Sequence, residues 1–258
     1  MNSQKSMNAN DRVAIVTGAG GGVGRAISKR LYADGAKIVI VGRDLTRLNS
    51  FAREFDDENR LLAIKADITK ETDVVNVIEQ TLSTFDRINI LINNAGTINE
   101  PKPFHLMSED DWAPLIGTNL VGTLRTTKSV LPIMMEAKAG NIVNISSLLG
   151  IRAIPRVPLS VYGVTKAAVI MFTRSIAVEY GPYGVRCNCI APSTIRTQSI
   201  EPYLEDEEAR TILESTFPLR RIGNAEDIAG AVSYLCSGDA NWITGVVMTV
   251  DGGISAKQ

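Results

Sequence analysis

Arg12-Val-Ala-Ile-Val-Thr17 runs directly into Thr17-Gly-Ala-Gly-Gly-Gly-Val-Gly24, and Arg25-Ala-Ile-Ser-Lys-Arg-Leu31 follows at helical period. The first stretch is apolar and β-branched, which predicts a buried strand. A strand, a glycine turn and a helix in this order place backbone N–H groups and a helix dipole where a pyrophosphate could bind. The glycines fit T-G-x-x-x-G-x-G, and the missing Gly-Lys-Ser/Thr ending excludes a P-loop. A plain tight turn is the alternative interpretation.

The same strand-then-helix rhythm continues along the chain. Helical stretches separate seven β-branched runs, at 12–17, 37–42, 60–65, 88–92, 140–145, 184–190 and 245–250. This alternation predicts an α/β fold, with a parallel, doubly wound, seven-stranded sheet and helices on both faces. We expect a disordered N-terminal tail at 1–11 and a single Rossmann-type domain at 12–258. In such a sheet a ligand binds beyond the carboxyl ends of the strands.

Composition argues against several classes of partner. The 258 residues are 45% hydrophobic and 21% charged, with a net charge of −1, so neither nucleic acid nor an anionic membrane is expected as a partner. The polar start of the chain lacks the apolar core of a signal peptide, and no apolar run approaches the roughly 20 residues that span a bilayer. We therefore expect a cytoplasmic protein.

Cysteine and histidine are too few for a metal centre. The chain has three cysteines, Cys187, Cys189 and Cys236, and one histidine, His105. A Cys-x-Cys pair could begin a metal site, but no second pair of thiols and no further histidine completes one. We expect reduced, buried, structural thiols and no bound metal. The lone His105 lies between prolines and is expected to be a solvated loop residue.

The best clue to chemistry is the pair Tyr162 and Lys166. They stand four residues apart in a helix-forming run, so both side chains should project from one helical face. A free phenol has a pKa near 10, and an ammonium group one turn away would favour the phenolate. The same spacing also occurs by chance on surface helices, so the pair needs support from the rest of the chain.

Further motifs occur in a fixed order around this pair. They are Ala66-Asp-Ile68, Asn93-Asn-Ala-Gly96, Asn119, Asn144-Ile-Ser-Ser147 and Thr244-Gly-Val-Val-Met-Thr-Val-Asp-Gly-Gly253. With these motifs the chain resembles the classical short-chain dehydrogenase/reductase family, and is similar to its 3-oxoacyl-ACP reductase-like members. The resemblance runs from about Arg12 to Gly253.

The resemblance implies a set of catalytic residues. Tyr162 would be the general acid in reduction, Ser147 would hydrogen-bond the substrate oxygen, and Lys166 would lower the phenol pKa while holding the nicotinamide ribose. Asn119 would hold a water that links Lys166 to solvent, or else would simply bond the backbone inside its helix. Ser146 is expected to be structural, because Ser147 fits the Ser-x-x-Gly pattern.

The resemblance also implies cofactor contacts. The implied residues are Gly18, Gly20, Gly22, Val23, Gly24, Arg43, Asp67, Ile68, Asn94, Ala95, Gly96, Tyr162, Lys166, Pro192, Ile195 and Thr197. Asp67 would meet the adenine amino group, although it could instead cap the helix expected to begin near Thr69. The chain departs from the family at Ser193, which occupies a usual glycine slot and puts the local backbone geometry in doubt.

The end of the second strand indicates which cofactor is preferred. An NAD site usually has Asp or Glu at the strand end to accept both ribose hydroxyls, and this chain has Gly42 there. Arg43 follows, and its guanidinium could pair with a 2′-phosphate. Arg43 could instead be solvated and neutralised by Asp44. We predict NADP as the preferred cofactor, with NAD possible.

The resemblance implies an NAD(P)-dependent oxidoreductase that acts on a small-molecule ketone or secondary alcohol. A 3-oxoacyl-thioester reductase is an alternative, and a non-catalytic cofactor-binding protein is a third interpretation. The segments expected to select the substrate, at 97–104, 151–160 and 193–216, mix apolar side chains with charges, and this suggests an apolar carbonyl compound. Long helices at about 109–136 and 160–181 and the C-terminal Asp251-Gly-Gly253 suggest a homotetramer.

Overall fold

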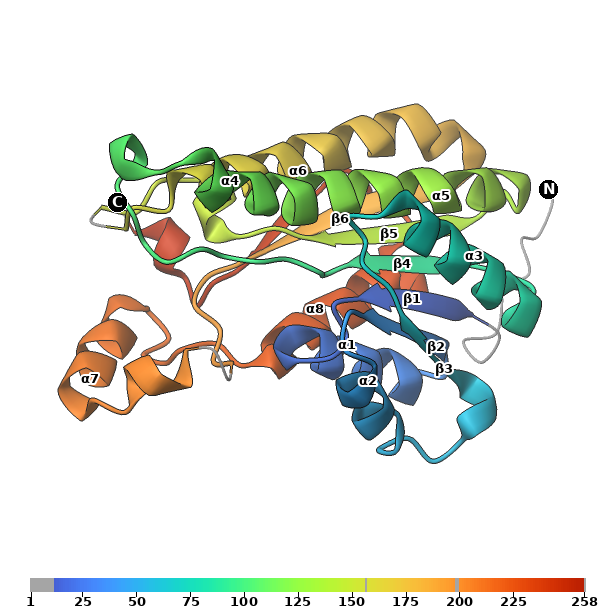
Figure 1. Ribbon diagram of the computed structural model, residues 1–258, viewed down its shortest axis with the longest axis horizontal. Helices are drawn as coiled ribbons and strands as arrows, with labels where there is room; N and C mark the ends of the chain where they lie inside the picture. Colours follow the sequence, from blue (N-terminus) through green and yellow to red (C-terminus); the bar gives the residue numbers. More distant parts are fainter. Residues whose placement is uncertain (1–11, 156, 198–199, 258) are drawn as a thin grey trace.

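Seven parallel strands form one sheet in the order β3-β2-β1-β4-β5-β6-β7 (Figure 1). The computed structural model describes residues 12–155, 157–197 and 200–257, so the predicted tail at 1–11 lies outside the described residues. The strands are β1 (Val13–Thr17), β2 (Lys37–Gly42), β3 (Leu61–Lys65), β4 (Ile90–Asn93), β5 (Gly140–Ile145), β6 (Val185–Pro192) and β7 (Val247–Val250). The predicted fold class is confirmed, and each β-branched run forms a strand.

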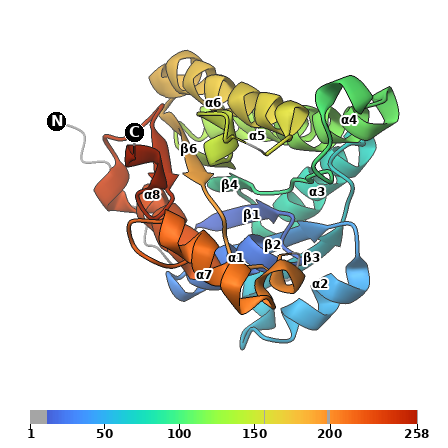
Figure 2. The same cartoon turned by 90° about the vertical axis from the view of Figure 1, so that its left-hand side faces the viewer.

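Helices cover both faces of the sheet (Figure 2). On one face lie α1 (Gly22–Ala33), α2 (Leu45–Ala52) and α8 (Ala225–Cys236). On the other face lie α3 (Glu71–Phe85), α5 (Thr123–Glu136) and α6 (Ser160–Tyr180), and α4 (Glu109–Leu115) precedes α5 in the same layer. Helix α7 (Glu207–Thr216) lies apart, beyond one end of the sheet (Figure 1).

Short 3₁₀ turns complete the described elements. They are Glu58–Arg60, Phe104–Leu106, Leu148–Gly150, Gly181–Tyr183, Glu201–Leu204, Gly238–Ala240 and Ile254–Ala256. The turn at Leu148–Gly150 follows β5 directly and lies at the same edge of the sheet as the glycine turn after β1.

Successive residues of each strand pack into two different cores. In β1, Val16 packs with Ile27 of α1 and Val232 of α8, whereas its neighbour Ile15 packs with Val130 of α5 on the opposite face. Because helices cover both faces, both alternating sets of side chains must be apolar. This explains why the strands read as continuous apolar runs in the sequence.

Helix α6 owes its apolar composition to this packing. It is the one described helix that is long and apolar enough to cross a membrane, judged by length and composition alone. Its inner side chains Ile176 and Ala177 join Cys187 of β6 in the core. The helix therefore lies against the sheet as a core helix of the α/β fold.

The predicted helix at 109–136 is helical throughout but not regular. Between α4 and α5 the residues Ile116–Gly122 form a π-helical stretch that contains Asn119. The Thr123 hydroxyl donates to the backbone oxygen of Asn119 at 2.9 Å. π-helical turns are rare and frequently occur at functional sites, and no sequence period indicates this one.

The glycine turn between β1 and α1 is packed against the end of β4. Gly18 has φ +66°, and a Cβ at this position would lie 2.8 Å from the Cα of Ala95. A Cβ at Gly24 would lie 2.4 Å from the backbone oxygen of Gly18 and 2.7 Å from Nδ2 of Asn94. Atoms cannot approach this closely, so the turn requires glycine at both positions.

Gly24→Ala should therefore destabilise the protein, whereas Gly21→Ala, in the same turn, should not. A Cβ at Gly21 meets no atom within 4 Å, and its backbone is extended. Overpacking typically costs about 1–3 kcal/mol, against less than about 0.5 kcal/mol for a neutral surface change. Urea unfolding of the two variants measures the difference, and equal free energies of unfolding would contradict the packing argument.

Candidate active site

Two glycines let the turn after β5 approach helix α6. A Cβ at Gly150 would lie 2.7 Å from the backbone carbon of Lys166, and a Cβ at Gly163 would lie 2.9 Å from the backbone oxygen of Leu149. This close approach brings Ser147, just before the turn, to Tyr162 in the first turn of α6. The Ser147 hydroxyl lies close enough to the Tyr162 phenol to lower the pKa of the phenol.

The Ser147 hydroxyl is oriented by its own backbone. It accepts a hydrogen bond from the Leu149 N–H at 3.2 Å, as the residue that caps a short helical turn commonly does. Ser146 points elsewhere, because its hydroxyl donates to the backbone oxygen of Lys166 at 2.8 Å. The two neighbouring serines thus differ in their surroundings: Ser147 faces Tyr162, whereas Ser146 anchors α6.

Lys166 reaches from α6 back to the end of β5. Its Nζ donates to the backbone oxygen of Ile145 at 2.9 Å and lies 5.7 Å from the centre of the Tyr162 ring. The residue is 5% exposed, and burial lowers the pKa of Lys166 to about 8. A Cβ at Gly96 would lie 3.4 Å from this Nζ, so the loop after β4 passes beside the ammonium group.

The protonation of Tyr162 differs from the sequence expectation. Burial raises the pKa of the Tyr162 phenol above its ordinary value, and the Ser147 hydroxyl lowers it by less. The expectation that Lys166 lowers the phenol pKa is therefore wrong for this structure. The reason is desolvation: the phenol is buried, and the Lys166 ammonium group donates to the Ile145 carbonyl oxygen instead.

Asn119 holds the loop after β4 against α6. Its Oδ1 accepts from the Thr97 N–H at 2.7 Å, and its Nδ2 donates to the Thr97 backbone oxygen at 2.9 Å and to the Thr165 hydroxyl at 3.2 Å. Both amide hydrogens are thus used by protein groups. The structure brings Asn119 to the site, where its side chain bonds the backbone of the loop after β4 and not the backbone inside its own helix.

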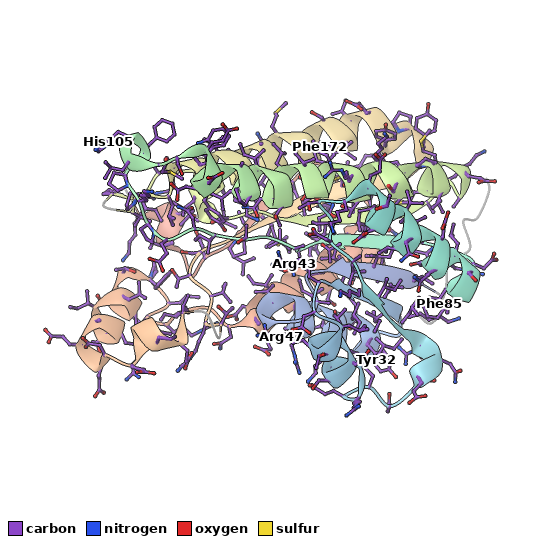
Figure 3. The ribbon with its side chains drawn as sticks, viewed as in Figure 1. Tyr32, Arg43, Arg47, Phe85, His105 and Phe172 are labelled. Carbon is purple, nitrogen blue, oxygen red and sulfur yellow. The ribbon has the colours of Figure 1, made fainter. Side chains whose placement is uncertain are left out.

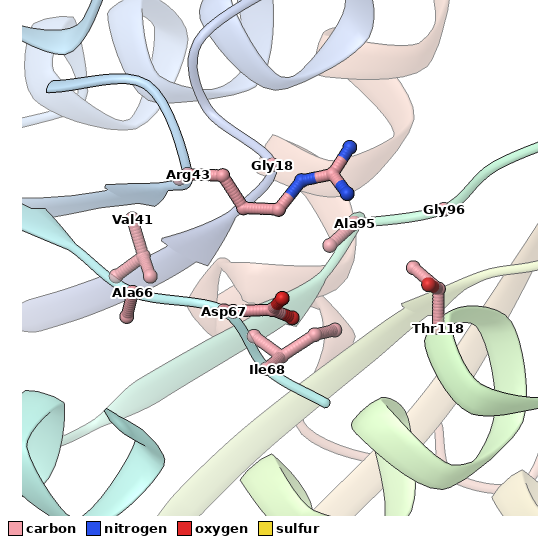
Figure 4. A pocket seen from close by; sticks show the side chains of 10 residues that line it. Gly18, Val41, Arg43, Ala66, Asp67, Ile68, Ala95, Gly96 and Thr118 are labelled. Atoms are coloured by element: carbon pink, nitrogen blue, oxygen red, sulfur yellow. The ribbon is translucent and has the colours of Figure 1, made fainter. Parts of the chain in front are cut away.

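A pocket of about 110 Å³ opens at the carboxyl ends of β1, β2 and β3 (Figure 4). Six of the residues expected to contact a cofactor line it, namely Gly18, Arg43, Asp67, Ile68, Ala95 and Gly96. Val41, Gly42, Ala66 and Thr118 line it as well, although they were not expected as contacts. Gly42, Ala66 and Thr118 each directly precede an expected site residue, and Val41 precedes Gly42. That adjacency is the signal that could have revealed them.

Asp67 serves the pocket and also a local turn. Its carboxylate accepts from the Thr69 N–H at 3.0 Å and from the Thr69 hydroxyl at 2.8 Å, and α3 begins only at Glu71. Burial raises the pKa of Asp67, but these bonds and the nearby charge of Arg43 hold it below the ordinary value overall. Asp67 therefore stays ionised, caps a turn rather than the helix, and faces Arg43 across the pocket (Figure 4).

Asp44, which could have neutralised Arg43, interacts with Arg47 instead. The Asp44 carboxylate caps α2 by accepting from the Arg47 N–H at 3.1 Å, and it pairs with the Arg47 side chain at 3.4 Å. None of the ion pairs in the described part of the chain involves Arg43. Arg43 directly follows β2, and Arg47 lies in the first turn of α2; both are labelled in Figure 3.

The remaining expected contacts shape the rim of this edge. Gly20 lies beside Arg47 and Leu48, Val23 packs with the core under α1, and Asn94 bonds the backbone of the glycine turn. Thr197 lies against Gly22, where a Cβ would be 3.1 Å from its methyl group. Pro192 ends β6 at the same edge of the sheet.

Directly after β6, the backbone at Ser193 does not adopt the left-handed conformation that favours glycine. Ser193 is absent from the residues with positive φ, so the usual glycine is not needed at that position. Ile195 pairs with Gly223 and lines a second cavity of about 100 Å³ with Phe217 and Asp227, rather than the first pocket.

The pocket and the glycine turn fit a dinucleotide. Helix α1 begins at Gly22 with no side-chain cap and no acidic residue in its first turn, so its N–H groups and dipole can receive a phosphate. The pocket beside it carries an apolar side chain, a carboxylate and a guanidinium, which suit adenine and ribose.

Cysteine and histidine lie away from this site. Cys187, Cys189 and Cys236 are buried free thiols, and burial raises the pKa of each. His105 lies on an exposed 3₁₀ turn at the periphery (Figure 3). Among the residues described, no group of three or more His, Cys, Asp or Glu could hold a metal ion.

Comparisons with known proteins agree with this architecture. The family model described as enoyl-(acyl carrier protein) reductase matches residues 18–255. Levodione reductase of Leifsonia aquatica is 36% identical over 255 residues, with 95% of each chain covered. The chain belongs to the classical short-chain dehydrogenase/reductase family.

Two solved structures show the same fold with a nicotinamide cofactor. A 3-ketoacyl-(acyl-carrier-protein) reductase from Brucella melitensis complexed with NADH has a TM-score of 0.87 and 34% identity, with 96% of this chain and 99% of that chain covered. ElxO with NADP bound has a TM-score of 0.90 and 28% identity, with coverage of 96% and 100%.

Proposed function

We propose that this protein is an NADP-preferring oxidoreductase that interconverts a small ketone and the corresponding secondary alcohol. The observation that carries the proposal is the convergence of Ser147, Tyr162 and Lys166 beside Gly96, at the edge of the sheet where the pocket opens. Hydroxyl, phenol and ammonium groups in this arrangement can bind a carbonyl oxygen and move a proton to it.

The bound nicotinamide would supply the hydride, and the protein would handle the oxygen. Ser147 would hydrogen-bond the carbonyl oxygen, and Tyr162 would donate a proton to it as negative charge develops. Because burial keeps the pKa of Tyr162 high, the phenol is protonated at neutral pH and ready to donate. Lys166 would hold the ribose hydroxyls with its remaining N–H groups, and oxidation would reverse the proton flow.

The same chemistry suits two substrate classes. Levodione reductase and the Brucella 3-ketoacyl reductase are both named as reductases, so a free ketone and a 3-oxoacyl thioester are both candidates. The free ketone is favoured by the exposed apolar side chains Ile98, Ile151 and Val157, which are 55%, 46% and 38% exposed. Their loops are joined by the Lys102 N–H, which donates to the Pro158 backbone oxygen at 3.0 Å. Arg156 and the Tyr203 side chain, in the segments expected to select the substrate, lie outside the described residues. A non-catalytic role would leave the complete Ser/Tyr/Lys set without a purpose.

Tyr162→Phe should lower kcat for ketone reduction by about 10²–10⁴-fold, the usual contribution of a general acid. The dissociation constant of NADPH should stay nearly unchanged, because the ring and its packing remain. Stopped-flow or steady-state absorbance of the reduced nicotinamide measures the rate, and fluorescence titration measures binding. Wild-type kcat in Tyr162→Phe across the active pH range would refute the proton-transfer role.

The preference for NADP rests on Arg43. Its guanidinium lines the pocket and is not paired with Asp44, which Arg47 occupies. Gly42 occupies the position where an NAD site carries an acid. A Cβ at Gly42 would make only ordinary contact, at 3.5 Å from Leu48, so the backbone there accepts a residue with a side chain.

Arg43→Ala should raise KM for NADPH by roughly 10–150-fold, if a charge-assisted bond of about 1.5–3 kcal/mol is lost, and should leave KM for NADH nearly unchanged. Gly42→Asp should shift the preference toward NAD. Arg53→Ala is the control, because it removes an exposed cation at the end of α2 outside the pocket. Equal wild-type KM values for the two cofactors, unchanged by Arg43→Ala, would show that Arg43 does not read the phosphate.

We expect the enzyme to work in the cytoplasm as a homotetramer. A tetramer with two-fold symmetry needs at least two separate self-complementary surfaces. The outer side of α6 exposes Val164, Met171 and Val178, seven residues apart, at 64%, 60% and 78%. Trp242, which follows α8 in the chain, is a further apolar side chain and is 99% exposed. Asp251 serves a local role, because its carboxylate accepts from the Gly253 and Ser255 N–H groups.

Light scattering should give four times the 27.9 kDa chain mass for the wild type. The double variant Met171→Glu with Val178→Glu should have a lower mass than the tetramer. Carboxylates on the outer side of α6 would be desolvated in the interface, and this would destabilise the assembly. Val75→Glu is the control, since this partly exposed valine lies on α3, away from α6. A wild-type mass of one chain at micromolar concentration would contradict the assembly.

A further inference from the structure

The first turns of α6 are held from two sides by side-chain hydroxyls. Ser146 donates to the backbone oxygen of Lys166 at 2.8 Å from the β5 side. On the other side, the Thr165 hydroxyl donates to the backbone oxygen of Tyr162 at 2.7 Å and accepts from Nδ2 of Asn119 at 3.2 Å. Thr165 is 1% exposed, so no solvent can replace these partners.

The Thr165 hydroxyl links α6 to the π-helical stretch and, through Asn119, to the loop after β4. Asn119 lies in the π-helical stretch and is 1% exposed. Its other amide hydrogen is donated to the Thr97 backbone oxygen, and its Oδ1 accepts from the Thr97 N–H. Thr97 directly follows Gly96, which lies beside the Lys166 ammonium group. A chain of hydrogen bonds thus runs from the loop after β4, through Asn119 and Thr165, to the backbone of Tyr162.

We infer that Thr165 is a positioning residue for the reaction, which fixes the Tyr162 phenol relative to the loop that borders the cofactor pocket. The inference rests on the proposed function. Loss of the hydroxyl would leave an Asn119 N–H buried without a partner and would break the link from Asn119 to α6, so α6 and the loop after β4 could shift relative to each other. A general acid must reach the substrate oxygen within hydrogen-bond distance, so a small shift weakens proton transfer.

Thr173 on the same helix supplies a matched control. It is 0% exposed, its hydroxyl donates to the backbone oxygen of Val169 at 2.8 Å, and it accepts from Nδ2 of Asn144 at 2.9 Å. The chemistry and burial are those of Thr165, two turns further from Tyr162. Thr165→Val and Thr173→Val therefore each remove one donated and one accepted side-chain hydrogen bond. Only the bonds lost in Thr165→Val involve Asn119 and Tyr162.

The experiment compares Thr165→Val, Thr165→Ser and Thr173→Val in the full-length protein. We expect kcat for ketone reduction to fall at least about 10-fold in Thr165→Val, since a misplacement of about 1 Å can cost up to 10²-fold. The dissociation constant of NADPH should change less than about twofold, and Thr165→Ser should recover kcat to within about threefold of wild type. Thr173→Val should lower the melting temperature about as much as Thr165→Val but leave kcat near wild type.

Equal kcat values in Thr165→Val and Thr173→Val would overturn the inference, as would a Thr165→Ser variant as slow as Thr165→Val. If Thr165→Val does not fold, Thr165→Ala carries the same comparison. Tyr162→Phe distinguishes a failure of the role of Thr165 from a failure of the proposed function. A slow Tyr162→Phe beside a normal Thr165→Val refutes only the role of Thr165, whereas a fully active Tyr162→Phe refutes the proposed function itself.

Discussion

The site depends on the hydrogen bonds that hold the carboxyl ends of β1 and β4 together. The Asn94 side chain donates to the backbone oxygens of Thr17 and Gly18, at 3.0 and 3.2 Å, and the Thr17 hydroxyl accepts from the N–H groups of Asn94 and Ala95. These strands lie side by side at the centre of the sheet, where the strand order reverses. At such a point the chain leaves neighbouring strands toward opposite faces, and this opens the crevice in which a ligand can bind.

Close approach of backbones then builds the rest of the site. Gly24 lets α1 lie against Gly18, and Gly150 with Gly163 lets the turn after β5 lie against α6. The phenol, the serine hydroxyl and the ammonium group meet because their backbones meet. Hydroxyls and one amide then lock the arrangement, and the buried polar groups involved find protein partners, as low-dielectric surroundings require.

Burial decides the protonation of the site more than neighbouring charge does. Desolvation raises the pKa of Tyr162 and lowers that of Lys166 to about 8, so each group is pushed toward its neutral form. The four-residue spacing predicted a lowered pKa for Tyr162, because that prediction included the ammonium group of Lys166 and left out desolvation of the phenol. A four-residue spacing says that two side chains share a face, but it says nothing about the dielectric around them.

The sequence by itself determined the strand and helix rhythm, the glycine turn after β1, and the order of the motifs that end at the carboxyl edge of the sheet. These features are local or periodic, so they can be read from neighbouring letters. Only the tertiary structure decided the π-helical turn around Asn119, the partners of that side chain, the engagement of Asp44 by Arg47 rather than Arg43, and the pKa of Tyr162. Each of these depends on which distant segments pack together and how much water they exclude, and neither quantity is encoded in the spacing of residues along the chain.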